Sequence, residues 1–345
     1  MRKIEKELYI EILRIVAVLF VIFNHTDGYF LYYCNTENPL TWWFSFLGSV
    51  LCRSNVPLFV MITGTLLLDK TESMYSLFKK RVLKIGSVLF SFSFFYYVLD
   101  VYRDKTINFS ILEFLRGLLK GSIQDSFWYL YLYLGLLLLL PLLRKMAVSC
   151  SNAELKYFLC LQFIFETSGG IFSFLTGIEI NSYLYIVNDY VFYLLSGYYL
   201  GRRIKVERID KKSMIASSGM IFLCIVGTFF FVKLDWRRTG TYHQAILDLL
   251  AAVLAINIFL CVRYIFWKYS IPKKVKGIIY EAGKCVFGIY LLEQFARIQL
   301  MPFYLYLSQN TFGIFACSCY IIASFSLAWF YTEVLKRVPG VKRLL

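Results

Sequence analysis

The stretch Tyr9-Ile-Glu-Ile-Leu-Arg14-Ile-Val-Ala-Val-Leu-Phe-Val-Ile-Phe-Asn24-His25 places a cation and an imidazole inside one of the most hydrophobic parts of the chain. Every residue between Arg14 and His25 is apolar except Asn24. On an α-helix their eleven-residue separation is about 16.5 Å of rise and about three turns, so both side chains lie on one face. Ionisable side chains within a membrane-spanning helix are expensive and usually mark function. The stretch therefore predicts a membrane helix that carries a functional site, as in an enzyme.

The composition of the whole chain also indicates a membrane protein. Of its 345 residues 59% are hydrophobic, 19% are aromatic and only 17% are charged. Runs of about 20 apolar residues recur along the chain, which is the length needed to cross a hydrocarbon core about 30 Å thick. The sequence therefore predicts a polytopic integral membrane protein of the all-α class.

We predict a helix bundle of about ten transmembrane helices that forms a single domain over residues 1–345. The sequence shows no internal repeat and no linker long enough to divide it. The first helix is expected to be retained, because no small-residue cleavage site follows it. The predicted spans are 9–31, 42–68, 84–102, 126–143, 156–177, 183–200, 213–233, 243–266, 285–301 and 312–334.

The loop charges predict the orientation of the bundle. With a cytoplasmic N-terminus, the inside segments hold 27 lysines and arginines and the outside loops hold 8, Arg297 among them. This bias follows the positive-inside rule and predicts that both termini are cytoplasmic. It also accounts for the net charge of +15 without nucleic-acid binding, since such loops face anionic lipid headgroups. Arg14 then lies in the inner half of the first span and His25 in the outer half.

The second predicted span contains residues that interrupt a smooth membrane helix. Arg53, Asn55 and Pro57 predict a broken or kinked helix at a functional place. We expect Arg53 near the outer half, where it contacts an acceptor molecule or pairs with Asp27 or Glu37.

Several kinds of site find no support in the sequence. The nine cysteines lack metal-ligand spacing, and most fall inside predicted spans, where cysteine behaves as a small hydrophobic residue. No metal site, phosphate-binding Gly-rich loop or Gly-x-Ser-x-Gly elbow is predicted. The second histidine, His243, is expected to be an exposed interface residue in an outside loop.

Five segments together resemble a known family. They are Arg14-x10-His25, Asn55-Val-Pro-Leu-Phe-Val-Met-Ile-Thr-Gly64-Thr-Leu-Leu, Phe78-Lys-Lys-Arg81-Val-Leu-Lys84, Ser126-Phe-Trp128-Tyr-Leu-Tyr131 and Phe287-Gly288-Ile-Tyr290-Leu-Leu. In this order, over essentially the whole chain, they resemble the membrane-bound acyltransferase-3 family, in its stand-alone O-acetyltransferase form. Three positions depart from the family pattern: Thr63 stands where Ser is common, Lys84 where Arg is usual, and Glu293 where His often follows the last motif.

The resemblance implies a reaction and its partners. The donor would be an acyl-CoA, most often acetyl-CoA, which acts from the cytoplasm as a co-substrate, with no bound cofactor. The acceptor would be a hydroxyl of a cell-envelope saccharide or polysaccharide, reached from the outer face of the inner (cytoplasmic) membrane. Acetyl-CoA, the saccharide and membrane lipids are the expected partners, and nucleic acid is not.

The resemblance also suggests roles for the two residues of the first span. His25 is expected to act as general base, because imidazole with a pKa of about 6.5 suits proton removal at neutral pH. An acyl-imidazole intermediate is the less favoured alternative, and a histidine that only bonds a neighbouring helix is another. Arg14 would hold the donor or stabilise the oxyanion, unless it only snorkels to the interface. Glu166 or Glu293 could orient His25, and the sequence leaves this choice open.

The remaining candidates form two groups. Donor phosphates would bind Lys80, Arg81 and Lys84, although ordinary positive-inside anchoring also explains this basic cluster. The acceptor or its pocket would involve Arg53, Asn55, Trp128, Tyr131 and Glu293, although aromatic side chains are common at membrane interfaces.

A transporter or flippase for a lipid-linked saccharide is the rival interpretation. Ten spans, a broken second helix and charges within the membrane fit it as well. Against it, the chain shows no two halves of repeated hydropathy and no paired broken helices. A membrane sensor without catalysis is a weaker third alternative.

Overall fold

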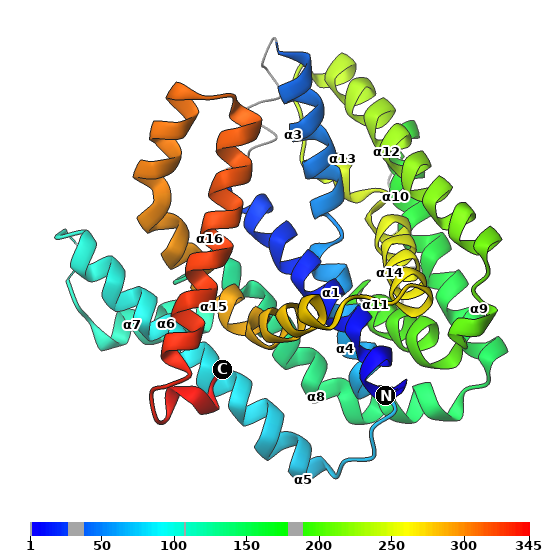
Figure 1. The fold of residues 1–345 in the computed structure, drawn as a ribbon, viewed down its shortest axis with the longest axis horizontal. Helices are drawn as coiled ribbons and strands as arrows, with labels where there is room; N and C mark the ends of the chain where they lie inside the picture. Colours follow the sequence, from blue (N-terminus) through cyan, green and yellow to red (C-terminus); the bar gives the residue numbers. More distant parts are fainter. Residues whose placement is uncertain (1, 27–37, 107, 179–188) are drawn as a thin grey trace. The chain divides into compact units, whose positions relative to one another are not determined.

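The computed structural model describes residues 2–26, 38–106, 108–178 and 189–345, and every regular element in this part is helical (Figure 1). This confirms the predicted all-α class. The chain forms two compact units, one of Met1–Leu67 with Cys150–Leu335 and one of Leu68–Ser149 with Lys336–Leu345. The single transmembrane domain over residues 1–345 stays a prediction.

The first unit contains the helix that carries Arg14 together with those packed around it. Its helices are α1 (Arg2–Asn24), α3 (Pro39–Cys52), α4 (Asn55–Leu67), α9 (Asn152–Phe163), η3 (Ile164–Ser168), α10 (Gly169–Thr176), α11 (Asp189–Tyr198), η5 (Tyr199–Arg203), η6 (Val206–Arg208), α12 (Lys211–Thr239), α13 (Ala245–Asp248), α14 (Ala251–Lys268), α15 (Lys273–Asn310) and α16 (Gly313–Leu335).

The second unit is built on two long helices. Its elements are α5 (Met74–Leu77), η1 (Phe78–Val82), α6 (Leu83–Arg103), α7 (Ile111–Lys120), η2 (Asp125–Phe127), α8 (Trp128–Ser149) and η7 (Val341–Arg343). The buried Phe114 fixes the short helix α7 by packing edge-on against Phe90 and Phe94 of α6. Aromatic edge-to-face packing of this kind stabilises a contact beyond its buried area.

Helix α1 forms the interior of the first unit. It packs against α3, α4, α14, α15 and α16, and Leu13, Ala17, Val18 and Ile22 are completely buried. The apolar residues between Arg14 and His25 therefore serve helix packing. This arrangement surrounds the first predicted span with protein and holds its polar side chains in fixed positions.

The second predicted span is broken, as its sequence indicates. Helix α3 ends at Cys52 and α4 begins at Asn55. In the turn between them, the Ser54 hydroxyl donates to the Leu51 carbonyl at 2.7 Å and Leu58 N donates to the Ser54 carbonyl at 2.9 Å. Pro57 lies in the first turn of α4, where its missing N–H costs no helical hydrogen bond.

Helices α4 and α11 approach each other unusually closely through glycine. A Cβ on Gly64 would overlap the Leu194 carbonyl oxygen, and one on Gly197 would overlap the Met61 backbone. The Thr65 hydroxyl lies 2.7 Å from the Gly197 carbonyl oxygen and can donate to it. Small residues allow such contact between helices in a membrane, so Gly64 of the second motif has a packing role.

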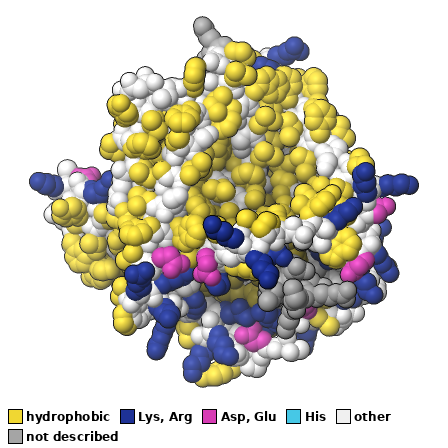
Figure 2. All heavy atoms as spheres, in the orientation of Figure 1, with side chains coloured by type: hydrophobic (Ala, Val, Ile, Leu, Met, Phe, Trp, Pro, Cys, Tyr) yellow, Lys and Arg dark blue, Asp and Glu magenta, His cyan; other side chains and the backbone are white. Residues whose placement is uncertain are grey.

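Helix occurs in each of the ten predicted spans, although residues 27–31 and 183–188 lie outside the described part. Within that part, six helical stretches are long and apolar enough to cross a membrane: Pro39–Leu67, Met74–Arg103, Asp125–Ser149, Lys211–Thr239, Ala251–Lys268 and Gly313–Leu335. Figure 2 shows broad areas of exposed apolar side chains, as expected of helices that face lipid. The count of ten and the cytoplasmic termini stay predictions.

Candidate active site around His25

His25 directly follows the last residue of α1 and faces α15. Its backbone N–H still donates to the Val21 carbonyl at 3.0 Å, so the helical turn continues through it. Its Nδ1 lies 2.8 Å from Oε1 of Glu293, a residue with no solvent exposure. The packing of α1 against α15 thus brings together two polar residues that are 268 positions apart.

Arg297 completes the surroundings of this pair from one turn further along α15. Its Nε donates to Glu293 Oε2 at 2.7 Å, and its Nη1 donates to the His25 carbonyl oxygen. Its own carbonyl accepts from the buried Tyr320 hydroxyl at 2.9 Å. A buried carboxylate is tolerated only when it is paired, and Arg297 and His25 together pair both oxygens of Glu293.

This geometry fixes the tautomer of His25. An ionised carboxylate accepts but does not donate, so Nδ1 carries the proton and Nε2 presents its lone pair. Within the described part of the chain, Nε2 makes no hydrogen bond, and the side chain keeps 23% of its surface exposed. The imidazole is therefore held by one nitrogen while the other can take a proton.

Of the two carboxylates that the sequence leaves open, Glu293 is the one that orients His25. Helix η3 contains Glu166, whose side chain lies outside the described part. Arg297 was not among the predicted site residues, because it was counted with the outside loops although it falls within the predicted span 285–301; it lies inside α15 and is buried. The spacing of four between Glu293 and Arg297 within an apolar stretch was the available signal.

Arg14 lies on α1 about 16.5 Å of helical rise away from His25. Its Nη1 donates to both carboxylate oxygens of Glu11, at 2.8 and 3.1 Å, and 32% of its side chain is exposed. Glu11 in turn packs against Gly283 of α15, where any added Cβ would overlap it. Arg14 is thus held in place by an ion pair and still accessible.

Arg53 and Asn55 occupy the break that lies beside the His25 end of α1. The Cys52 thiol, at the end of α3, connects this break to the end of α1, because it lies 3.6 Å from Asn24 Oδ1. Asp27 and Glu37, the expected partners of Arg53, lie outside the described residues. The Nε atom of Arg53 is buried and makes no hydrogen bond within the described residues. It lies 3.8 Å from Oδ1 of Asp248. Asn55 Oδ1 accepts from Val56 N at 2.6 Å and so supports the start of α4.

The basic cluster belongs to the second unit and contains an ion-pair network. Glu72 Oε2 accepts from Arg81 Nε and from Arg144 Nη2, each at 3.1 Å. Burial favours a higher pKa for Glu72, but the two arginines outweigh it and hold that pKa below its ordinary value. Lys80 is exposed and Lys84 is half-buried. Arg144 was not a candidate, because nothing in its sequence surroundings distinguishes it from a loop cation.

Trp128 and Tyr131 stand at the start of α8 in the second unit. Trp128 is 45% exposed, which suits an interface aromatic. The Tyr131 hydroxyl donates to the Leu118 carbonyl at the end of α7, and its ring packs beside Gly121. Tyr131 therefore fixes α7, and a contact with an acceptor stays a prediction.

Within the described residues, no group of three or more His, Cys, Asp or Glu side chains is arranged to hold a metal ion. The site thus holds an imidazole oriented by a buried carboxylate in an all-helical, multi-pass membrane protein, an arrangement suited to moving a proton. The family model described as an acyltransferase domain, that of the acyltransferase-3 family, matches residues 7–333, and the chain belongs to this family. Neither the curated proteins nor the solved structures compared with the chain give a match.

Proposed function

We propose that the protein transfers an acyl group, acetyl from cytoplasmic acetyl-CoA, to a hydroxyl of a cell-envelope saccharide in the inner (cytoplasmic) membrane. The family supports acyl transfer. The observation that carries the proposal is the hydrogen bond of 2.8 Å between His25 Nδ1 and the buried Glu293. It leaves Nε2 as a base of fixed direction, which is what transfer to an alcohol requires.

In the proposed step His25 acts first on the acceptor hydroxyl and then on the leaving thiolate. Nε2 of His25 removes the hydroxyl proton while the acceptor oxygen attacks the thioester carbonyl carbon, and a C–O bond forms. The tetrahedral intermediate collapses with cleavage of the C–S bond, and the imidazolium returns the proton to the CoA thiolate. Glu293 stabilises the imidazolium, and Arg297 pairs with the second oxygen of Glu293.

Of the two roles open for Arg14, the geometry favours holding the donor. About 16.5 Å of helix separates Arg14 from His25, so its guanidinium does not reach the carbonyl that His25 serves. The extended acyl-pantetheine arm would then have to span the distance from Arg14 to His25. Arg14 would bind the donor by exchanging its contact with Glu11 for pantetheine or phosphate oxygens.

Lys80, Arg81 and Lys84 are proposed to bind the phosphates of CoA. Phosphate would compete with Glu72 for Arg81, since both are anionic acceptors for the same guanidinium. On the acceptor side, Arg53 and Asn55 are proposed to contact the saccharide, because Cys52 joins their turn to Asn24, the neighbour of His25. Trp128 and Tyr131 remain proposed acceptor contacts of the second unit.

The test is a transfer assay on the purified full-length chain in lipid vesicles. It uses acetyl-CoA labelled in the acetyl group, extracted envelope glycans as acceptor, and a matched reaction without glycan. Label in ester linkage to the glycan, with release of free CoA in equal amount, is the expected result. Movement of intact lipid-linked saccharide across the vesicle without transfer of label would overturn the proposal and favour a flippase.

A further inference from the structure

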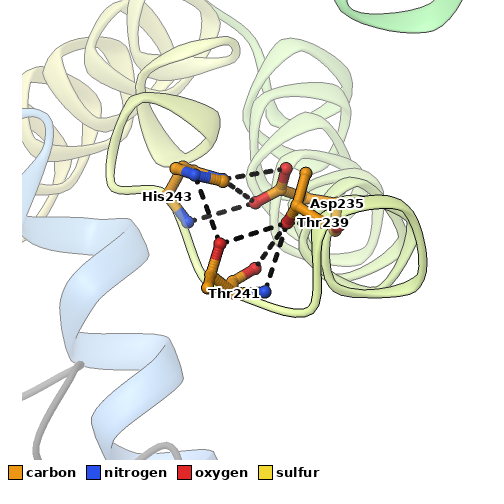
Figure 3. A network of polar contacts seen from close by, with 4 residues as sticks. All are labelled: Asp235, Thr239, Thr241 and His243. Carbon is orange, nitrogen blue, oxygen red and sulfur yellow. Dashed lines mark hydrogen bonds and ion pairs between the residues drawn. The ribbon is translucent and has the colours of Figure 1, made fainter.

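The loop after α12 contains a second oriented histidine, which the proposed function does not use. Gly240, with a φ of 70°, ends α12 and turns the chain so that Thr241 and His243 return beside the last turns of that helix. There the side chain of Asp235, 7% exposed, lies against the half-exposed His243 (Figure 3). A glycine suits this left-handed position, because other residues are strained there.

The carboxylate of Asp235 fixes both the backbone and the ring of His243. The backbone N–H of His243 donates to Asp235 Oδ2 at 3.1 Å, and Nδ1 lies 2.9 Å from Oδ2 and 3.1 Å from Oδ1. An ionised carboxylate only accepts, so Nδ1 carries the proton and Nε2 is left as an acceptor. Nε2 lies 3.3 Å from the hydroxyl oxygen of Thr241 (Figure 3).

The hydroxyl network allows Thr241 to donate its proton to the imidazole of His243. Thr239 has one hydroxyl proton, and the Asp235 and Thr241 carbonyl oxygens are its acceptors at 2.9 and 3.1 Å. The Thr241 hydroxyl then has two acceptors for its own proton, Thr239 Oγ1 at 3.2 Å and His243 Nε2. Only the imidazole is a base. A hydroxyl, an imidazole and a buried carboxylate in this relation are the arrangement that activates Ser or Thr as a nucleophile.

We propose that Thr241, activated by His243 and oriented through Asp235, is an acyl-accepting nucleophile that reacts with esters or thioesters at the surface of the first unit. His243 Nε2 takes the Thr241 proton as Oγ1 attacks the carbonyl carbon and forms a C–O bond. The bond to the leaving alcohol or thiol breaks, and the imidazolium gives that group the proton. Water or another hydroxyl then attacks the carbonyl carbon of the threonyl ester while His243 takes its proton; the bond to Thr241 Oγ1 breaks, and the imidazolium protonates Oγ1.

The experiment treats the purified full-length chain with p-nitrophenyl acetate, which serves as a generic ester. Release of p-nitrophenolate is followed, and peptide mass spectrometry locates the acetyl group. Thr241 is expected to carry it in the wild-type protein, and Thr241→Ser is expected to be acetylated at the same position. Thr241→Ala should lose the modification, while His243→Gln should slow it about 100-fold or more.

Thr311→Ala is the matched control, because the exposed Thr311 also follows a helix and its hydroxyl donates to a helical carbonyl, that of Leu307, but it belongs to α15 and not to this network. It is expected to leave acetylation of Thr241 intact. Absence of acetyl on Thr241, or equal modification of both threonines irrespective of His243, would overturn the proposal. This readout does not involve glycan or His25, so it is independent of the proposed transferase reaction.

Discussion

Glu293 Oε1 and His25 Nδ1 lie 2.8 Å apart across the contact between α15 and α1, and Glu293 is completely buried. The carboxylate thereby engages Nδ1 and leaves Nε2 for a reacting group. This relationship also gives meaning to the departure from the family pattern at position 293, since the residue present there acts on His25 through a direct hydrogen bond.

Replacing this carboxylate tests its role as a positioning group. Glu293→Gln keeps the shape but removes the charge that fixes the tautomer and stabilises the imidazolium. The turnover number for acetyl transfer is expected to fall about 100-fold or more, with the KM for acetyl-CoA little changed. Glu113→Gln is the control, because Glu113 pairs with Arg116 at 2.6 Å on an exposed helix. A similar loss in both variants would contradict the role of Glu293.

Removal of Arg297 should affect stability. Arg297→Met leaves the buried Glu293 without its closest cation, at an expected cost of about 3–5 kcal/mol in the free energy of unfolding. Thermal unfolding in detergent measures this loss. The double variant Glu293→Gln with Arg297→Met removes both charges and should recover part of it. A double variant no more stable than the single one would contradict a charge-pairing role.

The close contact of α4 with α11 predicts a steric effect. Gly64→Ala would push a methyl group into the Leu194 carbonyl, and backbone cannot move aside as a flexible side chain can. We expect a loss of about 1–3 kcal/mol in the free energy of unfolding. Gly219→Ala, within α12 and with nothing near its added Cβ, should be neutral or stabilising. Equal unfolding temperatures for the two variants would refute the packing argument.

The two roles considered for Arg14 differ in their kinetic signature. If Arg14 holds the donor, Arg14→Ala should raise the KM for acetyl-CoA about tenfold or more and change the turnover number little. If it stabilised the oxyanion, the turnover number would fall instead. Steady-state rates at varied acetyl-CoA separate these outcomes, and a pure loss of turnover number would contradict the donor-binding role.

The stability of the protein should depend on pH through Glu72. Its two arginine partners lower its pKa in the folded state below the ordinary value of 4.5. The ion pairs of Glu72 therefore contribute fully to the free energy of unfolding above about pH 4.5, where Glu72 is ionised in the unfolded chain as well. This contribution is lost as the pH falls through the lower pKa that Glu72 has in the folded protein. Glu72→Gln should unfold at lower temperature than wild type at pH 7, and this difference should shrink as the solution is acidified. A difference that does not change with pH would argue against the ion pairs.

Much of the helical architecture could be predicted, because apolar runs and their interruptions act locally. The break at Arg53 to Asn55 is an example, since a cation, an amide and a nearby proline are read directly from the sequence. Orientation of His25 by a carboxylate could be anticipated as well, but not which one. The choice of Glu293 depends on how α15 packs against α1, which sequence periodicity does not fix.

The missed residues have the same explanation. Arg297 and Arg144 resemble loop cations when each is considered in its own segment, and both acquire their role from a distant or buried carboxylate. His243 was expected to be only an exposed interface residue. It is exposed, but the turn at Gly240 brings it to Asp235, eight positions earlier. Sequence periodicity does not predict a contact that such a turn creates.

The proposed role of His25 as the base in acyl transfer is tested by single-turnover transfer of labelled acetyl from acetyl-CoA to envelope glycan. Wild type is compared with His25→Ala at saturating donor, with binding of acetyl-CoA measured separately. We predict that label reaches the glycan with wild type, that the variant is slower by about 100-fold or more, and that donor binding is retained. Equal rates of labelling by the two proteins would contradict the account.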